Sequence, residues 1–170
     1  YHLQFKHIAF MNLFTDGNIL DICKFFLNDE YYKELPEQDA NFVLSQYNAR
    51  SSVVKLPLHI DSNIPYISNK LLAMQVAFSL NGQTSSSGST FILPGSHNLN
   101  RLPERTIDIE NLQSLECDPG DTIIWDSRLW HGAYENSTKQ ERWSLVGTFK
   151  PWWLKQYFDP VFGTPEEIFK

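Results

Sequence analysis

After Pro36 the chain consists largely of short runs rich in β-branched and aromatic residues. Such runs predict strands, and turn dipeptides such as Pro94-Gly95 and Pro119-Gly120 separate them, as does the polar loop 81–88. Many short strands with even turn spacing favour a sandwich or jelly roll. The predicted strands are Asn41–Tyr47, Ser52–Leu58, Leu71–Leu80, Ser89–Leu93, Thr122–Trp125, Trp130–Tyr134 and Trp143–Phe149.

The segment before Pro36 predicts an amphipathic helix. From Asn18 the apolar residues recur at helical spacing, and we expect the helix to end before Leu35. Phe25 and Phe26 are interpreted as core residues of this helix. With 170 residues and no linker-like break, residues 1–170 are expected to form a single domain.

Composition narrows the class of protein. A hydrophobic fraction of 42% predicts a globular chain. The net charge is −6 and no basic stripe is visible, which argues against a nucleic-acid partner and mildly disfavours a highly anionic substrate. No apolar run approaches the length of about 18 residues that a membrane helix needs. The start of the chain shows no signal-peptide pattern, so a cytoplasmic location is expected.

The two cysteines, Cys23 and Cys117, lie far apart and form no CxxC motif. Two buried thiols in a reducing compartment are therefore expected, in preference to a disulfide or a metal site. The sequence leaves the oligomeric state open.

The tripeptide His59-Ile60-Asp61 is the first candidate site. Side chains two residues apart share one face of a strand, so an imidazole nitrogen and a carboxylate oxygen can bind one divalent metal. A second His from elsewhere would complete the 2-His-1-carboxylate triad of non-haem Fe(II) oxygenases. A lone His-x-Asp arises often by chance, and a polar strand end is the alternative interpretation.

The later histidines are His97, in a turn-rich loop where a solvated or capping role is usual, and His131. A hairpin turning near residues 136–137 would place His131 roughly opposite Arg142 on one face. An Arg pointing into a metal cavity needs an anion, and a planar guanidinium suits a carboxylate. An Arg–Asp pair on a barrel face is the alternative for Arg142.

In their order along the chain, these motifs resemble the phytanoyl-CoA dioxygenase family of Fe(II)/2-oxoglutarate oxygenases. The resemblance covers roughly residues 41–150. It rests on His59-Ile60-Asp61, the loop Pro94-Gly95-Ser96-His97, Gly120-Asp121 before the next strand, and an Arg142 that stands eleven residues after His131.

The fold that this resemblance implies is mainly β: a double-stranded β-helix, or cupin-like jelly roll, with one or a few N-terminal helices packed on the outside. It implies that three residues hold Fe(II), namely His59, Asp61 and His131. It also implies that Arg142 grips the distal carboxylate of 2-oxoglutarate. Further contacts to 2-oxoglutarate or substrate are expected from Gln75, Gln46 and Asn48.

The implied reaction uses O₂ and 2-oxoglutarate to hydroxylate a small organic substrate, with succinate and CO₂ as products. Halogenases of this superfamily replace the carboxylate ligand by a small residue, so Asp61 favours hydroxylation. Three features depart from the family. The N-terminus is expected to be short, Ala133 stands where many members carry a hydroxyl residue that assists the Arg, and the loop 81–88 is rich in Ser where many members carry acidic or Asn residues. The alternatives are a non-catalytic jelly-roll binding module that retains the triad, and a cupin-type enzyme that uses another metal without a keto acid.

Overall fold

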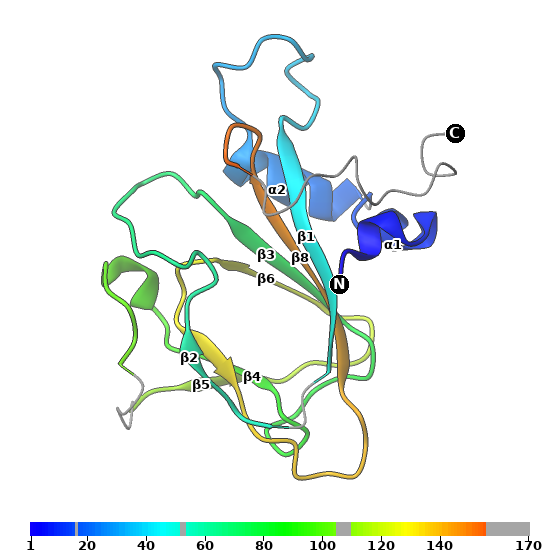
Figure 1. Ribbon diagram of the computed structural model, residues 1–170, viewed down its shortest axis with the longest axis vertical. Helices are drawn as coiled ribbons and strands as arrows, with labels where there is room; N and C mark the ends of the chain where they lie inside the picture. The colour runs from blue at the N-terminus through cyan, green and yellow to red at the C-terminus, as the bar shows by residue number, and fades with distance from the viewer. Residues whose placement is uncertain (16, 52–53, 105–109, 156–170) are drawn as a thin grey trace.

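Two four-stranded antiparallel sheets form a jelly roll in the computed structural model, which describes residues 1–15, 17–51, 54–104 and 110–155 (Figure 1). The mainly β fold expected from the sequence is confirmed. The first sheet has the order β1 (Phe42–Ser51), β8 (Trp143–Pro151), β3 (Met74–Ser79) and β6 (Thr122–Asp126). The second sheet has the order β2 (Leu56–His59), β7 (His131–Ala133), β4 (Thr90–Ile92) and β5 (Gln113–Leu115).

Short helices cover the first sheet at its β1 and β8 side, as Figure 1 shows. They are η1 (Leu3–Phe5), α1 (Ile8–Asn12) and α2 (Gly17–Leu27), and a further 3-10 turn, η2, spans Ser96–Asn98. The helix expected to continue until just before Leu35 ends at Leu27. The carboxylate of Asp29 accepts hydrogen bonds from the backbone amides of Tyr31 and Tyr32, and this local turn replaces helical bonds. No helix of the described residues is long and apolar enough to cross a membrane.

The buried stripe of α2 consists of Ile19, Cys23 and Leu27, which follow one another at four-residue spacing. Phe25 and Phe26 lie off this stripe and are 82% and 53% exposed, so their assignment to the core was wrong. Cys23 is fully buried, whereas Cys117 is only half-buried, and both are unpaired thiols. The expectation of two buried thiols therefore holds for Cys23 alone.

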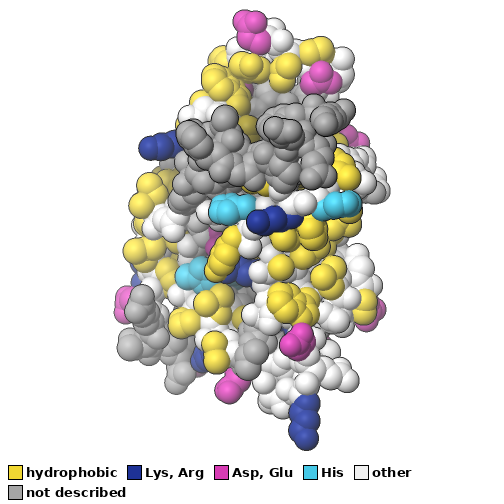
Figure 2. Space-filling model, turned by 45° about the vertical axis from the view of Figure 1, so that its right-hand side comes forward, with side chains coloured by type: hydrophobic (Ala, Val, Ile, Leu, Met, Phe, Trp, Pro, Cys, Tyr) yellow, Lys and Arg dark blue, Asp and Glu magenta, His cyan; other side chains and the backbone are white. Residues whose placement is uncertain are grey.

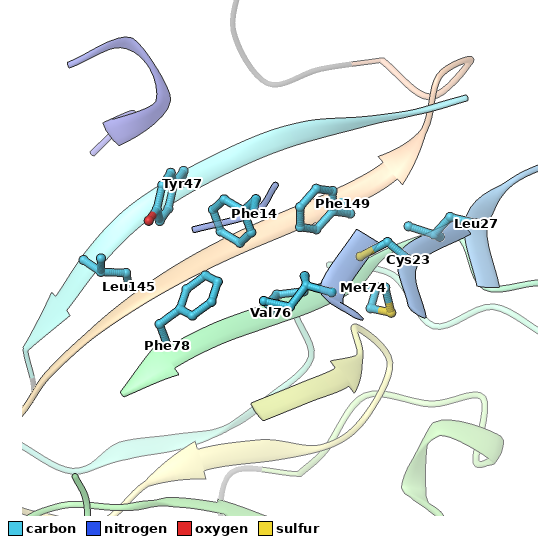
Figure 3. Packing of buried hydrophobic residues seen from close by; sticks show 10 residues of the cluster. Phe14, Cys23, Leu27, Tyr47, Met74, Val76, Phe78, Leu145 and Phe149 are labelled. Atoms are coloured by element: carbon cyan, nitrogen blue, oxygen red, sulfur yellow. The ribbon is translucent and has the colours of Figure 1, made fainter. Parts of the chain in front are cut away.

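The main hydrophobic core lies outside the roll, between the first sheet and the helices (Figure 3). Alternate residues of β3 and β8 point into it, including Val76 and Phe149. Phe14 sits at its centre, with ring centroids 4.6 Å from Tyr47, 5.0 Å from Phe78 and 5.2 Å from Phe149. Because this core stabilises the sheet from outside, the inner face of the sheet carries polar side chains around a cavity.

A β-bulge in β1 sets which side chains of that strand enter the cavity. Leu44 pairs with Phe149 and Gln46 with Thr148, so Ser45 is the extra residue. As a result Leu44 and Tyr47 both pack against the helical side, although they are three residues apart. Beyond the bulge, Gln46 and the residues two and four further on face the cavity.

Strands β7 and β8 do not form the expected hairpin. β7 pairs with β2 and β4 in one sheet, and β8 pairs with β1 and β3 in the other. The connecting segment instead pairs with the loop 84–89: Asn136 bridges to Ser87, and the amide of Ser137 donates to the carbonyl of Ser86. These contacts carry the chain from one sheet to the other.

The remaining strands follow the predicted runs with shifted ends. β1 extends to Ser51, beyond the predicted end at Tyr47, and β2 begins only at Leu56. Ser52 and Val53, at the start of the predicted strand Ser52–Leu58, lie outside the described residues. β5, with three residues and no β-branched side chain, was not predicted.

Candidate active site

Three side chains from distant parts of the chain meet between the sheets. His59 ends β2 and His131 begins β7, and the two residues pair directly across these strands. Asp61 follows two residues after His59. One ligand atom from each of the three side chains lies within 4.8 Å of the others. The structure thus brings together the three residues expected to hold the metal.

The position of Asp61 does not come from strand alternation, as the sequence had suggested, because β2 ends at His59. The carbonyl oxygen of Ser127 instead accepts hydrogen bonds from the backbone amides of Asp61 (2.9 Å) and Ser62 (3.0 Å). Ser127 is fully buried, and its own amide donates to the carbonyl of Ala73. This backbone anchor turns the Asp61 carboxylate towards the histidines.

Each imidazole ring is oriented by the carbonyl group of the residue two positions before it in the chain. Nδ1 of His59 lies 2.9 Å from the carbonyl oxygen of Pro57, and Nδ1 of His131 lies 2.9 Å from that of Leu129. A proton on each Nδ1 makes these hydrogen bonds and leaves a lone pair on each Nε2.

Both Nε2 atoms face the Asp61 carboxylate, at 3.6 Å for His59 and 3.2 Å for His131. Acceptor atoms this close repel one another unless a proton or a metal cation lies between them. Two neutral imidazoles and one carboxylate are also the donor set that suits Fe(II). The residues present therefore fit a divalent metal ion.

The pKa shifts of His59 and Asp61 also favour a cation in this cluster. Burial would lower the pKa of His59, but hydrogen bonds to Asp61 and to the Pro57 carbonyl outweigh it and raise that pKa above its ordinary value. Burial would raise the pKa of Asp61, but hydrogen bonds from His131 and His59 bring it well below its ordinary range. The carboxylate is thus held in its anionic form, which a metal cation requires.

The cavity has a volume of ≈ 580 Å³, and alternate residues of the first sheet form its wall. The strand registers arrange these wall residues in three cross-strand layers. The layer at the metal end contains Trp125, whose ring lies 5.4 Å from that of His131. The layers are Gln46, Thr148, Gln75 and Trp125; then Asn48, Val146, Ala77 and Ile123; then Arg50, Ser144 and Ser79.

Gln75, at the metal end of the wall, contacts Ser127, whose backbone carbonyl holds Asp61 in place. Its Nε2 donates to Ser127 Oγ at 3.1 Å, and its Oε1 accepts from Thr148 Oγ1 at 2.8 Å. Gln46 and Asn48 also line the cavity, and the Oδ1 of Asn48 accepts a hydrogen bond from the amide of His2. All three residues expected to contact co-substrate or substrate therefore lie on the wall.

Arg142 lines the other end of the cavity and is only 6% exposed. Its Nη1 donates to Ser144 Oγ at 3.3 Å, while its Nε is buried without a hydrogen-bond partner. Burial lowers the pKa of this guanidinium, against an opposing effect of Cys117. No ion pair among the described residues includes Arg142, so the alternative of an Arg–Asp pair is not seen.

Three residues of the site were not singled out from the sequence: Ser127, Ser144 and Thr148. The alternation of β8 places Ser144 and Thr148 on one face, so this pattern could have identified them. Ser127 acts through its backbone carbonyl and its position after β6, for which the sequence carries no signal. His97, in η2, is not part of the cluster of His59, Asp61 and His131.

Comparisons with known proteins show the family and the fold of the chain. The model of the family described as phytanoyl-CoA dioxygenase (PhyH) matches residues 1–144. Dioxygenase af480 of Aspergillus fumigatus is 28% identical over 137 residues, which are 76% of this chain and 40% of the relative. The uncharacterized protein Rv1501 of Mycobacterium tuberculosis is 28% identical over 95 residues, which are 56% of this chain and 35% of the relative. The chain thus spans well under half of each curated relative.

The fold is shared with solved structures of HygX from Streptomyces hygroscopicus. The structure with nickel, 2-oxoglutarate and hygromycin B has a TM-score of 0.70 at 18% identity and covers 89% of this chain and 68% of HygX. The structure with iron has a TM-score of 0.67 at 18% identity and covers 93% of this chain and 76% of HygX.

Proposed function

Because the chain belongs to the phytanoyl-CoA dioxygenase family, we propose that it is an Fe(II)- and 2-oxoglutarate-dependent dioxygenase that hydroxylates a small organic substrate. One observation carries the proposal. The cluster of His59, Asp61 and His131 lies at one end of the cavity, and the buried guanidinium of Arg142 lies at the other. No carboxylate of the described residues forms an ion pair with this guanidinium. A dicarboxylate could bind the metal through one end and the Arg142 guanidinium through the other.

In this proposal the two Nε2 atoms and the Asp61 carboxylate bind the iron. The carbonyls of Pro57 and Leu129 keep the imidazoles in the tautomer that leaves Nε2 able to do so. When bound, iron would supply the activation of O₂, which amino-acid side chains alone cannot provide. In the balanced reaction, substrate, O₂ and 2-oxoglutarate give hydroxylated substrate, succinate and CO₂.

The wall between the two ends suits the carbon chain of 2-oxoglutarate. Its middle layer presents the apolar side chains of Val146, Ala77 and Ile123, against which methylene groups can lie. Arg142 binds the distal carboxylate, and the anion gives the buried guanidinium the partner that its desolvation requires. The Ser144 hydroxyl, already bonded to Arg142, supplies the contact that Ala133 cannot make.

The polar groups at the metal end complete the site in this proposal. Gln75 is held by Ser127 and Thr148, and its remaining amide hydrogen and lone pair are available to the co-substrate. Gln46 at the metal end and Asn48 in the middle layer line the same wall from β1 and contact 2-oxoglutarate or substrate.

Two measurements test the proposal. The Ni(II)-loaded protein should bind 2-oxoglutarate in a calorimeter, and the Fe(II)-loaded protein should slowly release succinate even without substrate. Binding without any succinate would instead support a non-catalytic binding module. Absence of both binding and succinate would overturn the oxygenase assignment and favour a cupin-type enzyme that uses no keto acid.

A further inference from the structure

The mouth of the cavity carries two basic side chains. Arg50, near the end of β1, and Lys55, just before β2, both line the cavity and both are exposed to solvent. They flank the connection between the edge strands of the two sheets. Figure 2 turns the β1 side of the molecule forward and shows basic and histidine side chains gathered around the middle of this face.

The charges of the cavity leave these two side chains uncompensated. Among the described lining residues, the charged side chains are Arg50, Lys55, Arg142 and Asp61, with Asp61 the one carboxylate. A divalent metal and Arg142 together balance the Asp61 carboxylate and a 2-oxoglutarate dianion. With metal and 2-oxoglutarate bound, the cavity would keep a local charge of about +2 at its mouth, whereas the net charge of the chain is −6.

Within the described part of the chain, no carboxylate forms an ion pair with either Arg50 or Lys55. The guanidinium of Arg50 lies over the ring of Tyr1, at 5.6 Å from its centroid. Stacking occupies one face of the guanidinium and leaves its in-plane N–H groups able to bind an anion.

We propose that Arg50 and Lys55 form an anion subsite that binds a carboxylate or phosphate group of the substrate. This inference rests on the proposed function, since the substrate must reach the metal from this subsite. It also reverses the expectation from net charge, because the local field at the mouth is positive although the chain is acidic.

The registers give the subsite a distance from the metal. Arg50 belongs to the layer of Ser144, and Gln46 to the layer of Trp125 beside the metal cluster. The two residues are four apart on β1, which corresponds to about 13 Å at the rise of a strand. The substrate is therefore an elongated molecule whose anionic group stands roughly 10 Å or more from the carbon that is oxidised.

The experiment uses Mn(II) at the metal site, saturating 2-oxoglutarate, and methyl phosphate or acetate as the probe. Relaxation of the phosphorus or carbon nucleus by Mn(II) reports both binding and the distance to the metal. We expect at least one probe to bind at about 10–15 Å from the metal. The probe that binds more tightly identifies the group, phosphate or carboxylate.

The double variant Arg50→Gln, Lys55→Gln should bind that probe about tenfold more weakly, because it loses two exposed charge-assisted contacts. The matched control is Lys33→Gln, Lys155→Gln, which removes the same charge from exposed positions outside the cavity and should leave the affinity unchanged.

Three results would overturn the subsite: no binding of either probe, equal binding by the double variant, or a double variant that loses 2-oxoglutarate affinity instead. Failure of the wild-type protein to bind 2-oxoglutarate is a different result, because it contradicts the proposed function itself.

Discussion

Arg142 donates a hydrogen bond of 3.3 Å to the hydroxyl of Ser144, its neighbour on the cavity wall. This contact orients a buried guanidinium, and it places a hydroxyl next to the group proposed to bind 2-oxoglutarate. The pair leads to the first two predictions.

Ser144→Ala should weaken 2-oxoglutarate binding by about fivefold, because one hydrogen bond contributes about 1 kcal/mol. Calorimetry on the Ni(II)-loaded variant measures the change, and the affinity for Ni(II) should stay constant. Ser144→Thr retains the hydroxyl and serves as the control. Adding Ala133→Ser to Ser144→Ala should restore part of the affinity; an unchanged affinity in Ser144→Ala would contradict the role of this hydroxyl.

Arg142→Met should raise the thermal stability of the protein without ligands by about 1 kcal/mol, because it replaces a buried cation that has no ion-pair partner among the described residues. The same variant should lose the thermal stabilisation that 2-oxoglutarate gives the wild type. Scanning calorimetry with and without 2-oxoglutarate measures both effects. A less stable variant that still responds to 2-oxoglutarate would show that Arg142 has a structural role only.

Asp61→Asn should abolish tight metal binding, because it removes the one anionic ligand of the cluster. Metal content per folded protein after equilibration with Fe(II) under anaerobic conditions measures the loss. His97→Ala is the matched control, since His97 lies outside the cluster, and it should retain the full metal content. Full retention in Asp61→Asn would contradict the ligand assignment.

Gly132→Ala should reduce both stability and metal affinity. A Cβ at Gly132 would overlap the ring of Phe91 and the carbonyl of Leu56, and β7 would have to move together with His131. Overpacking of this kind costs about 1–3 kcal/mol.

Gly147→Ala gives the comparison for Gly132→Ala. Its Cβ would overlap the ring of Phe14 on the helical side of the sheet. It should therefore lower the melting temperature while the folded fraction keeps its Ni(II) affinity. Equal losses of Ni(II) affinity in both variants would show that the position of β7 is not what the metal site senses.

Stability should fall as the pH rises above about 9. Burial raises the pKa of the Cys23 thiol to about 11 from its ordinary value of 9.0. In this range the unfolded thiol loses its proton while the folded one keeps it, so the unfolded state binds fewer protons and becomes more favourable. Urea midpoints from about pH 8 to about pH 10.5 measure the slope, and Cys23→Ala should flatten it. An equal slope in Cys23→Ala would assign the effect to other groups.

Most strands could be predicted because their signal is local. Runs such as Thr122–Trp125 and Trp143–Phe149 carry enough β-branched and aromatic residues to indicate a strand without any knowledge of its partners. β5 was not predicted because it is three residues long and has no β-branched or aromatic side chain. The helix end was misplaced because a single carboxylate, that of Asp29, redirects the backbone after Leu27.

The identities of the candidate site residues followed from motif order: His59, Asp61, His131 and Arg142 were named from the sequence, and the structure places all of them in one cavity. Their arrangement did not follow. The expected hairpin would have put His131 and Arg142 on one face of one sheet. Instead His131 begins β7 in the second sheet, and Arg142 stands just before β8 of the first sheet, at the opposite end of the cavity.

Propensity, alternation and motif spacing involve residues close in the chain, so most strands and the side chains available for chemistry could be identified without a fold. The folded chain was needed to show which strands pair, that the bulge at Ser45 turns Gln46 into the cavity, and that the Ser127 carbonyl holds Asp61. Burial of Arg142, without an ion pair to any described carboxylate, and exposure of Arg50 to solvent were likewise visible only in the fold. These outcomes depend on contacts between residues far apart in the chain, whose energies no local pattern contains.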